Sequence, residues 1–347
     1  MTAKTISVRR DALDPWLILP GSTGELSEES ASADDSIFGT NFTSMQPTLI
    51  SWTVNANAYF KGFPGYQASL RRAGTAVSMV AEPTALVGNG YYIIDRDRSL
   101  LDRNAPVIVN DDGVAVDPED IEYIDYLQGG VVFVSGYVVT GPVTITADYR
   151  PTTAICFAQT FSLTQTADTE NVTDFCSAQN NNGHAVFRYQ RQTVELSLDG
   201  FYNVNAAYSS DLITRDEVII EINPDGEGKS VARGYFKCTS TGQSGDVGNT
   251  ETQNATYMLF VPEGVVKPFT WYHDTTSSIP AAVKAVLDGW EDRAIMQVRY
   301  EPESLPGQTA VIRTGDVLIS DVSMESGVED INTFTVNLQG SGELSAD

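Results

Sequence analysis

Few residues in this chain have the types and spacings that suit catalysis. There are two histidines, His184 beside an Asn-Gly loop and His273 beside Trp271-Tyr272. General acid–base and metal chemistry both rely heavily on histidine. The chain has no Gly-x-Ser-x-Gly elbow, phosphate-binding loop or paired-histidine metal motif. We therefore interpret both histidines as packed or exposed side chains, and we expect no enzyme activity and no catalytic or cofactor-binding residues.

Two groups of aspartates have the donor type that divalent cations prefer. Asp95-Arg96-Asp97 lies near Asp102, and Asp111-Asp112 lies near Asp117. Neither group has the full spacing, or the glycine, of an EF-hand loop. We interpret them as solvated carboxylates in turns, and we expect no metal site and no cofactor.

The charge balance excludes several classes of partner. The chain has 46 Asp and Glu against 21 Lys and Arg, a formal net charge of −25 at pH 7. Such a chain lacks the basic patches that neutralise nucleic-acid phosphates or anionic lipids. No apolar run reaches the length of a membrane span, and no apolar signal core precedes Asp11. The three cysteines show no metal spacing and suit free thiols in a reducing cytoplasm.

The first half of the chain predicts three kinds of segment. Residues 16–19 suggest one strand or an anchoring arm, and the small, acidic residues 21–36 suggest a flexible linker or exposed loop. Alternation over residues 49–56 predicts a strand. Residues 67–150 contain short strands separated by turn residues, which predicts an added all-β domain, Ig-like or a small sandwich. Residues 1–66 either complete the sheet of the 151–347 domain or belong to the added domain.

The second half predicts further strands, one helix and a terminal hairpin. Helical spacing places Val283, Val286, Leu287 and Trp290 on one face of a short helix over residues 279–288. Residues 174–183 suggest a polar loop, and residues 242–255 a mobile one. In the hairpin of residues 317–340, apolar Phe334, Val336 and Leu338 alternate with polar neighbours. This pattern is typical of a strand with one buried and one solvated face.

This terminal hairpin resembles the C-terminal signature of siphophage major tail tube proteins. That pattern is a strand (residues 319–323), a Ser-Gly turn with acidic residues (326–330), and an alternating strand closed by Gln339-Gly340-Ser341-Gly342. The central block is also similar, through Asn171-Val172-Thr173, Asn182-Gly183 and the Leu-Ser-x-x-Gly-Phe run at residues 196–201. The helix before the terminal strands matches the one helix that flanks the family's sandwich. The resemblance covers about residues 152–347.

The resemblance implies a structural virion protein with a tail-tube-type β-sandwich or barrel at residues 151–347. Family subunits form hexameric rings that stack into a helical tube, whose lumen holds the tape measure protein and then passes genomic DNA without sequence-specific binding. Tail terminator and baseplate proteins close the ends of the tube. The protein would be assembled in the host cytoplasm and would meet no membrane. The acidic composition suits a lumen that repels phosphates, and the added domain would lie on the exterior.

Within this reading, four strands are candidates for the inner barrel: residues 155–166, 192–202, 317–324 and 332–339. The loops at residues 21–36 and 174–183 are candidates for stacking between rings. Two other functions remain open. One is a tail terminator or baseplate hub, which would form a ring without polymerising. The other is a bacterial surface adhesin or carbohydrate-binding protein, with Trp52, Trp271 and Tyr272 as exposed sugar platforms.

Overall fold

The computed structural model describes residues 3–34, 45–156, 158–201, 208–226, 228–245, 250–274, 276–303 and 310–346. The fold is mainly β, as predicted, with antiparallel pairing between strands. The chain forms two compact units, and neither is a continuous stretch. Unit 1 contains Met1–Pro64, Ser162–Val194 and Ile279–Asp347, and unit 2 contains Gly65–Phe161 and Glu195–Ser278. The ranges expected from sequence, 1–66, 67–150 and 151–347, were each continuous.

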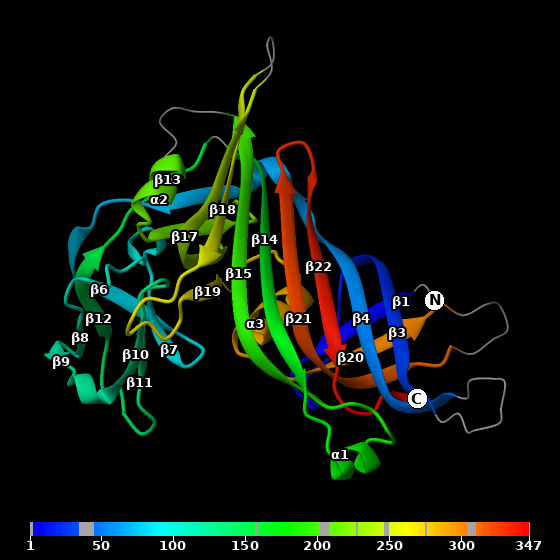
Figure 1. Ribbon diagram of the computed structural model, residues 1–347. Helices are drawn as coiled ribbons and strands as arrows, with labels where there is room; N and C mark the ends of the chain where they lie inside the picture. The colour runs from blue at the N-terminus through cyan, green and yellow to red at the C-terminus, as the bar shows by residue number, and fades with distance from the viewer. Residues whose placement is uncertain are drawn as a thin grey trace. The chain divides into compact units, whose positions relative to one another are not determined.

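Unit 1 is built from two antiparallel stretches of sheet that share one long strand (Figure 1). Its elements are β1 (Ala3–Arg9), β2 (Leu17–Ile18), β3 (Gly21–Asp34), β4 (Met45–Pro64), α1 (Phe175–Asn180), α3 (Ala281–Glu291), β20 (Met296–Pro302), β21 (Arg313–Gly327), β22 (Ile331–Gly340) and β23 (Ser345–Ala346). Strand β21 pairs with β20, which continues to β1 and β2, and also with β22, which continues to β4 and β3. The strands β14 (Ala158–Asn171) and β15 (Phe187–Phe201) each pass from one unit to the other.

The prediction of a linker at residues 21–36 was wrong. Residues 21–34 form β3, which pairs with β4 from Gly21↔Ala58 to Asp34↔Met45; Asp35 and Ser36 lie outside the described residues. This segment is small and acidic, and its own pattern is a weak strand signal. It becomes a strand because β4 pairs with it along its length, with two register shifts in the ladder, at Gly21/Thr23 and Ser30/Ser32. Residues 1–20 also differ from the prediction, since they contribute two strands, β1 and β2.

The core of unit 1 is organised around Trp52, which is 1% exposed. A Cβ atom added at Gly315 would lie 2.6 Å from the indole Cζ2, and one at Gly340 would overlap the ring. These two glycines, on β21 and β22, therefore leave the slot that the indole fills. The indole Nε1 donates a hydrogen bond to the carbonyl of Gly342 at 2.9 Å. The apolar face of α3, including Val283 and Leu287, is buried in the same unit.

The sequence predicted one helix, and the structure contains more than one. The predicted helix is α3, which begins at Ala281 with Pro280 as its N-cap. The described residues contain two further short helices, α1 and α2 (Tyr208–Thr214). Helix α1 lies inside the predicted loop 174–183 and starts with a capping box between Asp174 and Ser177. No helix in the described ranges is both long and apolar enough to cross a membrane.

Unit 2 contains a second sheet in addition to the strands that continue from β15. The continuing strands are β5 (Ser69–Ala73), β13 (Thr152–Ala154), β16 (Val218–Asn223), β17 (Ser230–Ser244), β18 (Thr252–Leu259) and β19 (Phe269–His273). The separate seven-stranded sheet has the order β10-β11-β7-β6-β12-β8-β9. Its strands are β6 (Val77–Val87), β7 (Gly90–Ile93), β8 (Ile108–Asp111), β9 (Val114–Ala115), β10 (Ile121–Asp125), β11 (Gly130–Phe133) and β12 (Val143–Tyr149). Short 3₁₀ turns lie at Gly65–Gln67, Arg96–Arg98 and Pro118–Asp120.

The predicted mobile loop 242–255 is largely strand. Strand β17 extends to Ser244, and β18 begins at Thr252 and pairs with it. Of the turn between them, residues 246–249 lie outside the described residues. The composition of this segment is polar and glycine-rich, so its strand character comes from cross-strand pairing rather than from local propensity.

A buried ion pair ties the two parts of unit 2 together. The Arg233 guanidinium on β17 lies 2.7 Å from the Glu221 carboxylate on β16, and both side chains are less than a tenth exposed. Arg233 also donates to the Ser99 hydroxyl at 2.7 Å and to the Leu127 carbonyl at 2.8 Å. Ser99 and Leu127 belong to the segment that carries the seven-stranded sheet. Because a buried charge is costly unless it is fully paired, this network fixes that segment against β16 and β17.

We predict that Gly340→Ala destabilises the protein by about 1–3 kcal/mol, because the new methyl group overpacks the Trp52 slot. The measurement is the urea unfolding midpoint, followed by tryptophan fluorescence. Val328→Ala, at a half-exposed position in the β21–β22 turn, is the control, and its change should stay within about 0.5 kcal/mol. Equal effects for the two variants would refute the role of the glycine slot.

Candidate functional site

Strands β21, β22, β4 and β3 are neighbours in one sheet (Figure 1). One face of this sheet carries polar side chains, except that Leu318 on β21 stands opposite Gln339. The pairing register aligns its side chains in rows that cross the strands. Asp321 opposes Asn337, which opposes Asn55, which opposes Glu25. The neighbouring rows are Ser323–Thr335–Asn57–Thr23 and Gln339–Thr53–Ser27. We call these three rows the polar face, and we take it as the candidate functional site.

Side-chain hydrogen bonds join neighbouring residues within two rows of the polar face. The Thr335 hydroxyl donates to the Asn57 amide oxygen at 3.0 Å, and the Asn57 amide nitrogen donates to the Thr23 hydroxyl at 3.0 Å. In the next row the Asn337 amide donates to the Asp321 carboxylate at 3.4 Å. These bonds pair some of the amide, hydroxyl and carboxylate groups of the face with one another.

The opposite face of the same strands is apolar, and this contrast is what the alternating sequence requires. Phe334, Val336 and Leu338 on β22 are at most 1% exposed. Val54 and Ala56 on β4 are buried on the same side. Since the side-chain period of a strand is two, burying this apolar set necessarily exposes Thr335, Asn337, Asn55 and Asn57 on the other face.

Apart from Lys61 on β4 and Arg313 at the start of β21, the charged residues of the strands that form the polar face are acidic. Strands β3, β14 and β22 and residues 314–327 of β21 contain no lysine or arginine. Their charged side chains are Glu25, Glu28, Glu29, Asp34, Asp168, Glu170, Asp316, Asp321 and Glu325. A basic partner from outside this set is Arg188 on β15, 2.7 Å from Glu170. Partial burial raises the pKa of Asp321, and the hydrogen bond from Asn337 opposes this shift.

The four strands predicted to form an inner barrel are neighbours in the sheet. β15, β14 and β21 are consecutive, and β22 pairs with β21. The hydroxyls of Thr166 on β14 and Thr193 on β15 lie 2.5 Å apart. Phe157 and Tyr202, at the ends of two predicted ranges, lie outside the described residues. Sequence reasoning found the strand in β4 but missed β3. The signal for a strand in β3 is weak: Gly24 and Leu26 alternate with Glu25 and Ser27.

The two histidines are held in structural contacts. His184 Nδ1 lies 2.9 Å from the Asn181 carbonyl in the turn after α1. His273 stacks on Trp271, with the ring centroids 5.6 Å apart, and its Nδ1 lies 3.0 Å from the Ser230 hydroxyl. Both side chains are partly buried. These contacts explain both residues through local packing and turn geometry.

The interpretation of both aspartate groups as solvated was wrong for two members. Asp102 is 8% exposed and pairs with Arg150 at 3.2 Å, and Asp111 is 4% exposed. Asp111 accepts hydrogen bonds from the backbone N–H groups of Thr140 and Gly141, both at 2.8 Å, which lowers its pKa. In the described residues, no group of three or more His, Cys, Asp or Glu side chains is arranged to hold a metal ion.

The tryptophans expected as exposed sugar platforms are buried. Trp52 is 1% exposed and Trp271 is 6% exposed. The Tyr272 ring is covered by the Arg96 guanidinium, 3.8 Å from its centroid. Sugar platforms need an open aromatic face, so these three residues do not form one.

Comparison with known proteins found structural matches but no sequence match. No protein-family model matches the chain, and no curated protein matches it. Among the solved structures that match is a chain from the tail of an empty GTA particle with C6 symmetry. That match has 13% sequence identity, covers 32% of this chain and 84% of the other, and has a TM-score of 0.29.

We predict that Asp321→Asn stabilises the protein at pH 7 and leaves it unchanged near pH 3. A raised pKa means that the folded state favours the protonated acid, so wild-type stability falls as the pH rises from the ordinary value of 3.8 through the raised one. The asparagine removes this loss and keeps an acceptor for Asn337. The measurement is the unfolding midpoint at both pH values. If Asp321→Asn were less stable than wild type at pH 7 and not at pH 3, the raised pKa of Asp321 would be contradicted.

Proposed function

We propose that this protein is a structural subunit of a phage-like tail, and specifically that its hexameric rings stack into a tail tube. The observation that carries the proposal is the polar face, with two rows of hydroxyl, amide and carboxylate side chains across β21, β22, β4 and β3 and a third across β22, β4 and β3. The sequence resemblance of residues 317–342 to tail tube subunits supports it, since β21 and β22 form the hairpin that the resemblance implies.

The polar face has the chemistry that a DNA channel requires. Strong binding of DNA comes from lysine and arginine that displace counterions from phosphates. The three rows of the polar face carry carboxylates, hydroxyls and neutral amides instead, so DNA would pass without being retained. In this proposal the face lines the lumen, first around the tape measure protein and then around the genome.

The edges of unit 1 suit assembly with other copies. Among the described strands, β3 pairs with β4 alone, so its outer edge ends the sheet. Exposed edge strands recruit other chains, and a closed ring of subunits uses this tendency productively. The proposed assembly is a six-fold ring in which sheets meet edge to edge. Terminator and baseplate proteins would bind the ends of the finished tube, within the virion.

Two exposed features of unit 1 are the proposed contacts between stacked rings. The distal part of the β3–β4 ribbon is exposed on both faces, from Glu28 to Asp34 and from Met45 to Thr48. Two-stranded ribbons are only marginally stable alone in water, so a neighbouring subunit would stabilise this one. In α1, Phe175 is 92% exposed. An exposed phenylalanine at the start of a helix is a plausible anchor for such a contact.

We predict that the purified protein forms rings with a central pore, and tubes as its concentration rises, in negative-stain electron microscopy. Phe175→Asp should raise the concentration needed for tubes by about tenfold or more, because a charge replaces an apolar contact. Val138→Asp, at a 76% exposed position in the segment of the seven-stranded sheet, is the matched control and should assemble like wild type. A protein that stays monomeric at every concentration contradicts the proposal, and closed rings that never stack favour a terminator or hub.

The assignment of the polar face to the lumen has its own test. In a Cys156→Ser, Cys176→Ser background, a cysteine is placed by Asn57→Cys on the polar face or by Val138→Cys in unit 2. In assembled tubes, we predict that a small maleimide labels both positions, whereas a maleimide on a large polymer labels only the second. Equal labelling of both positions by the large reagent would place the polar face on the exterior.

A further inference from the structure

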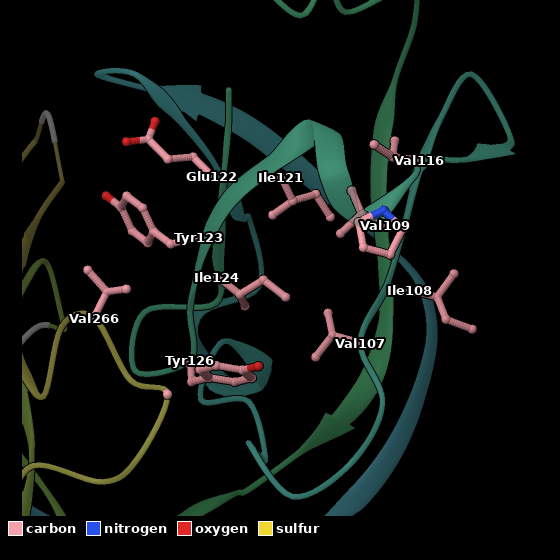
Figure 2. Close-up of a pocket in the computed structure, with 12 residues that line it drawn as sticks. Val107, Ile108, Val109, Val116, Ile121, Glu122, Tyr123, Ile124, Tyr126 and Val266 are labelled. Atoms are coloured by element: carbon pink, nitrogen blue, oxygen red, sulfur yellow. The ribbon is translucent and has the colours of Figure 1, made fainter. Parts of the chain in front are cut away.

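Unit 2 contains an open apolar pocket with a volume of about 410 Å³ (Figure 2). Most of its lining is aliphatic and comes from Val107, Ile108, Val109, Val116, Ile121 and Ile124. Figure 2 shows Ile121 and Ile124 directed toward Val107 and Val109, with Glu122 and Tyr123 on the side of Val266. Its volume falls within the range of about 300–1,000 Å³ that is usual for ligand pockets.

The pocket exists because the seven-stranded sheet does not close on itself. Strand β10 is one end of the strand order, and β8 and β9 form the other. The lining residues come from these two ends and from the loop at Gly264 and Val266. Val107, Val116, Ile121 and Ile124 pack on the core of the sheet while remaining partly exposed. Ile108 is 49% exposed and Val266 is 63% exposed, so the apolar wall reaches the surface.

The rim of the pocket is acidic. Glu122 lines it, Asp117, Glu119 and Asp120 flank its Pro118, and Glu263 precedes Gly264. Between Val107 and Tyr126 the chain has no lysine or arginine. Apart from Lys267, which follows the lining residue Val266, these charges are negative, and an apolar hollow with a mainly acidic rim favours an occupant that combines an apolar group with positive charge.

We propose that this pocket binds an apolar side chain of an extended, basic polypeptide segment from another protein. Since β10 is a terminal strand, an extended segment can lie alongside it, with alternate side chains entering the pocket and basic ones meeting the rim. This inference concerns the seven-stranded sheet and does not depend on tube assembly.

The test uses the full-length protein and a labelled, capped peptide, Lys-Val-Lys-Leu-Lys-Val-Lys, with binding followed by fluorescence anisotropy. We expect binding that weakens with added salt, and at least about tenfold weaker binding when the apolar residues of the peptide are replaced by serine. A peptide with glutamate in place of lysine should not bind. Equal binding of the apolar and serine peptides, or no binding of the first peptide, would overturn the proposal.

Paired surface variants locate the binding to the pocket. Val266→Lys, on the pocket wall, should weaken binding about tenfold, because it removes apolar wall and adds a repelling charge. Val114→Lys is the matched control, since Val114 is 70% exposed on β9 and does not line the pocket; its affinity should stay within about twofold of wild type. Both positions are exposed, so both variants should fold. Equal losses in the two variants would show that the acidic surface, not the pocket, attracts the peptide.

Discussion

The register of the β21–β22–β4 sheet is the constraint on which the polar face depends, and the Trp52 slot fixes it. The indole fits only where Gly315 and Gly340 face it, and its Nε1 is bonded to the Gly342 carbonyl. A slip of one residue along β22 would turn Phe334, Val336 and Leu338 toward solvent and bring Thr335 and Asn337 into the core. One close-packed contact therefore decides which chemistry the sheet presents.

In unit 2 a charge pair, rather than an apolar contact, performs the corresponding task. Arg233 and Glu221 are buried together, and Arg233 also bonds Ser99 and the Leu127 carbonyl. An ion pair in this position contributes little net stability over an apolar pair of the same shape, but it strongly penalises any arrangement that leaves one partner alone. The segment with the seven-stranded sheet is thereby held in one orientation against β16 and β17, which keeps its acidic-rimmed pocket in a defined shape.

The polar face of unit 1 and the apolar pocket of unit 2 follow opposite physical rules. The polar face carries carboxylates, hydroxyls and amides, some of them paired with one another, and no lysine or arginine, so it offers phosphates little to bind. The pocket of unit 2 leaves aliphatic area half exposed, and apolar area of this kind gains free energy when it is covered. The two surfaces differ in this way because the chain distributes its apolar residues differently over them.

The sequence by itself determined the strongly periodic parts of this protein. Alternation over residues 333–339 predicts β22 and its polar and apolar faces, and helical spacing of Val283, Val286 and Leu287 predicts α3, because these signals lie within one element. Only the tertiary structure decided that the acidic segment at residues 21–34 is the strand β3, that Trp52 is buried, and that Asp102 and Asp111 are enclosed. The reason is that strand pairing and burial depend on residues far away in the chain. Strand β4 supplies the pairing partner of β3, and Gly315 and Gly340 leave the space for Trp52. Arg150 pairs with Asp102, and the N–H groups of Thr140 and Gly141 donate to Asp111.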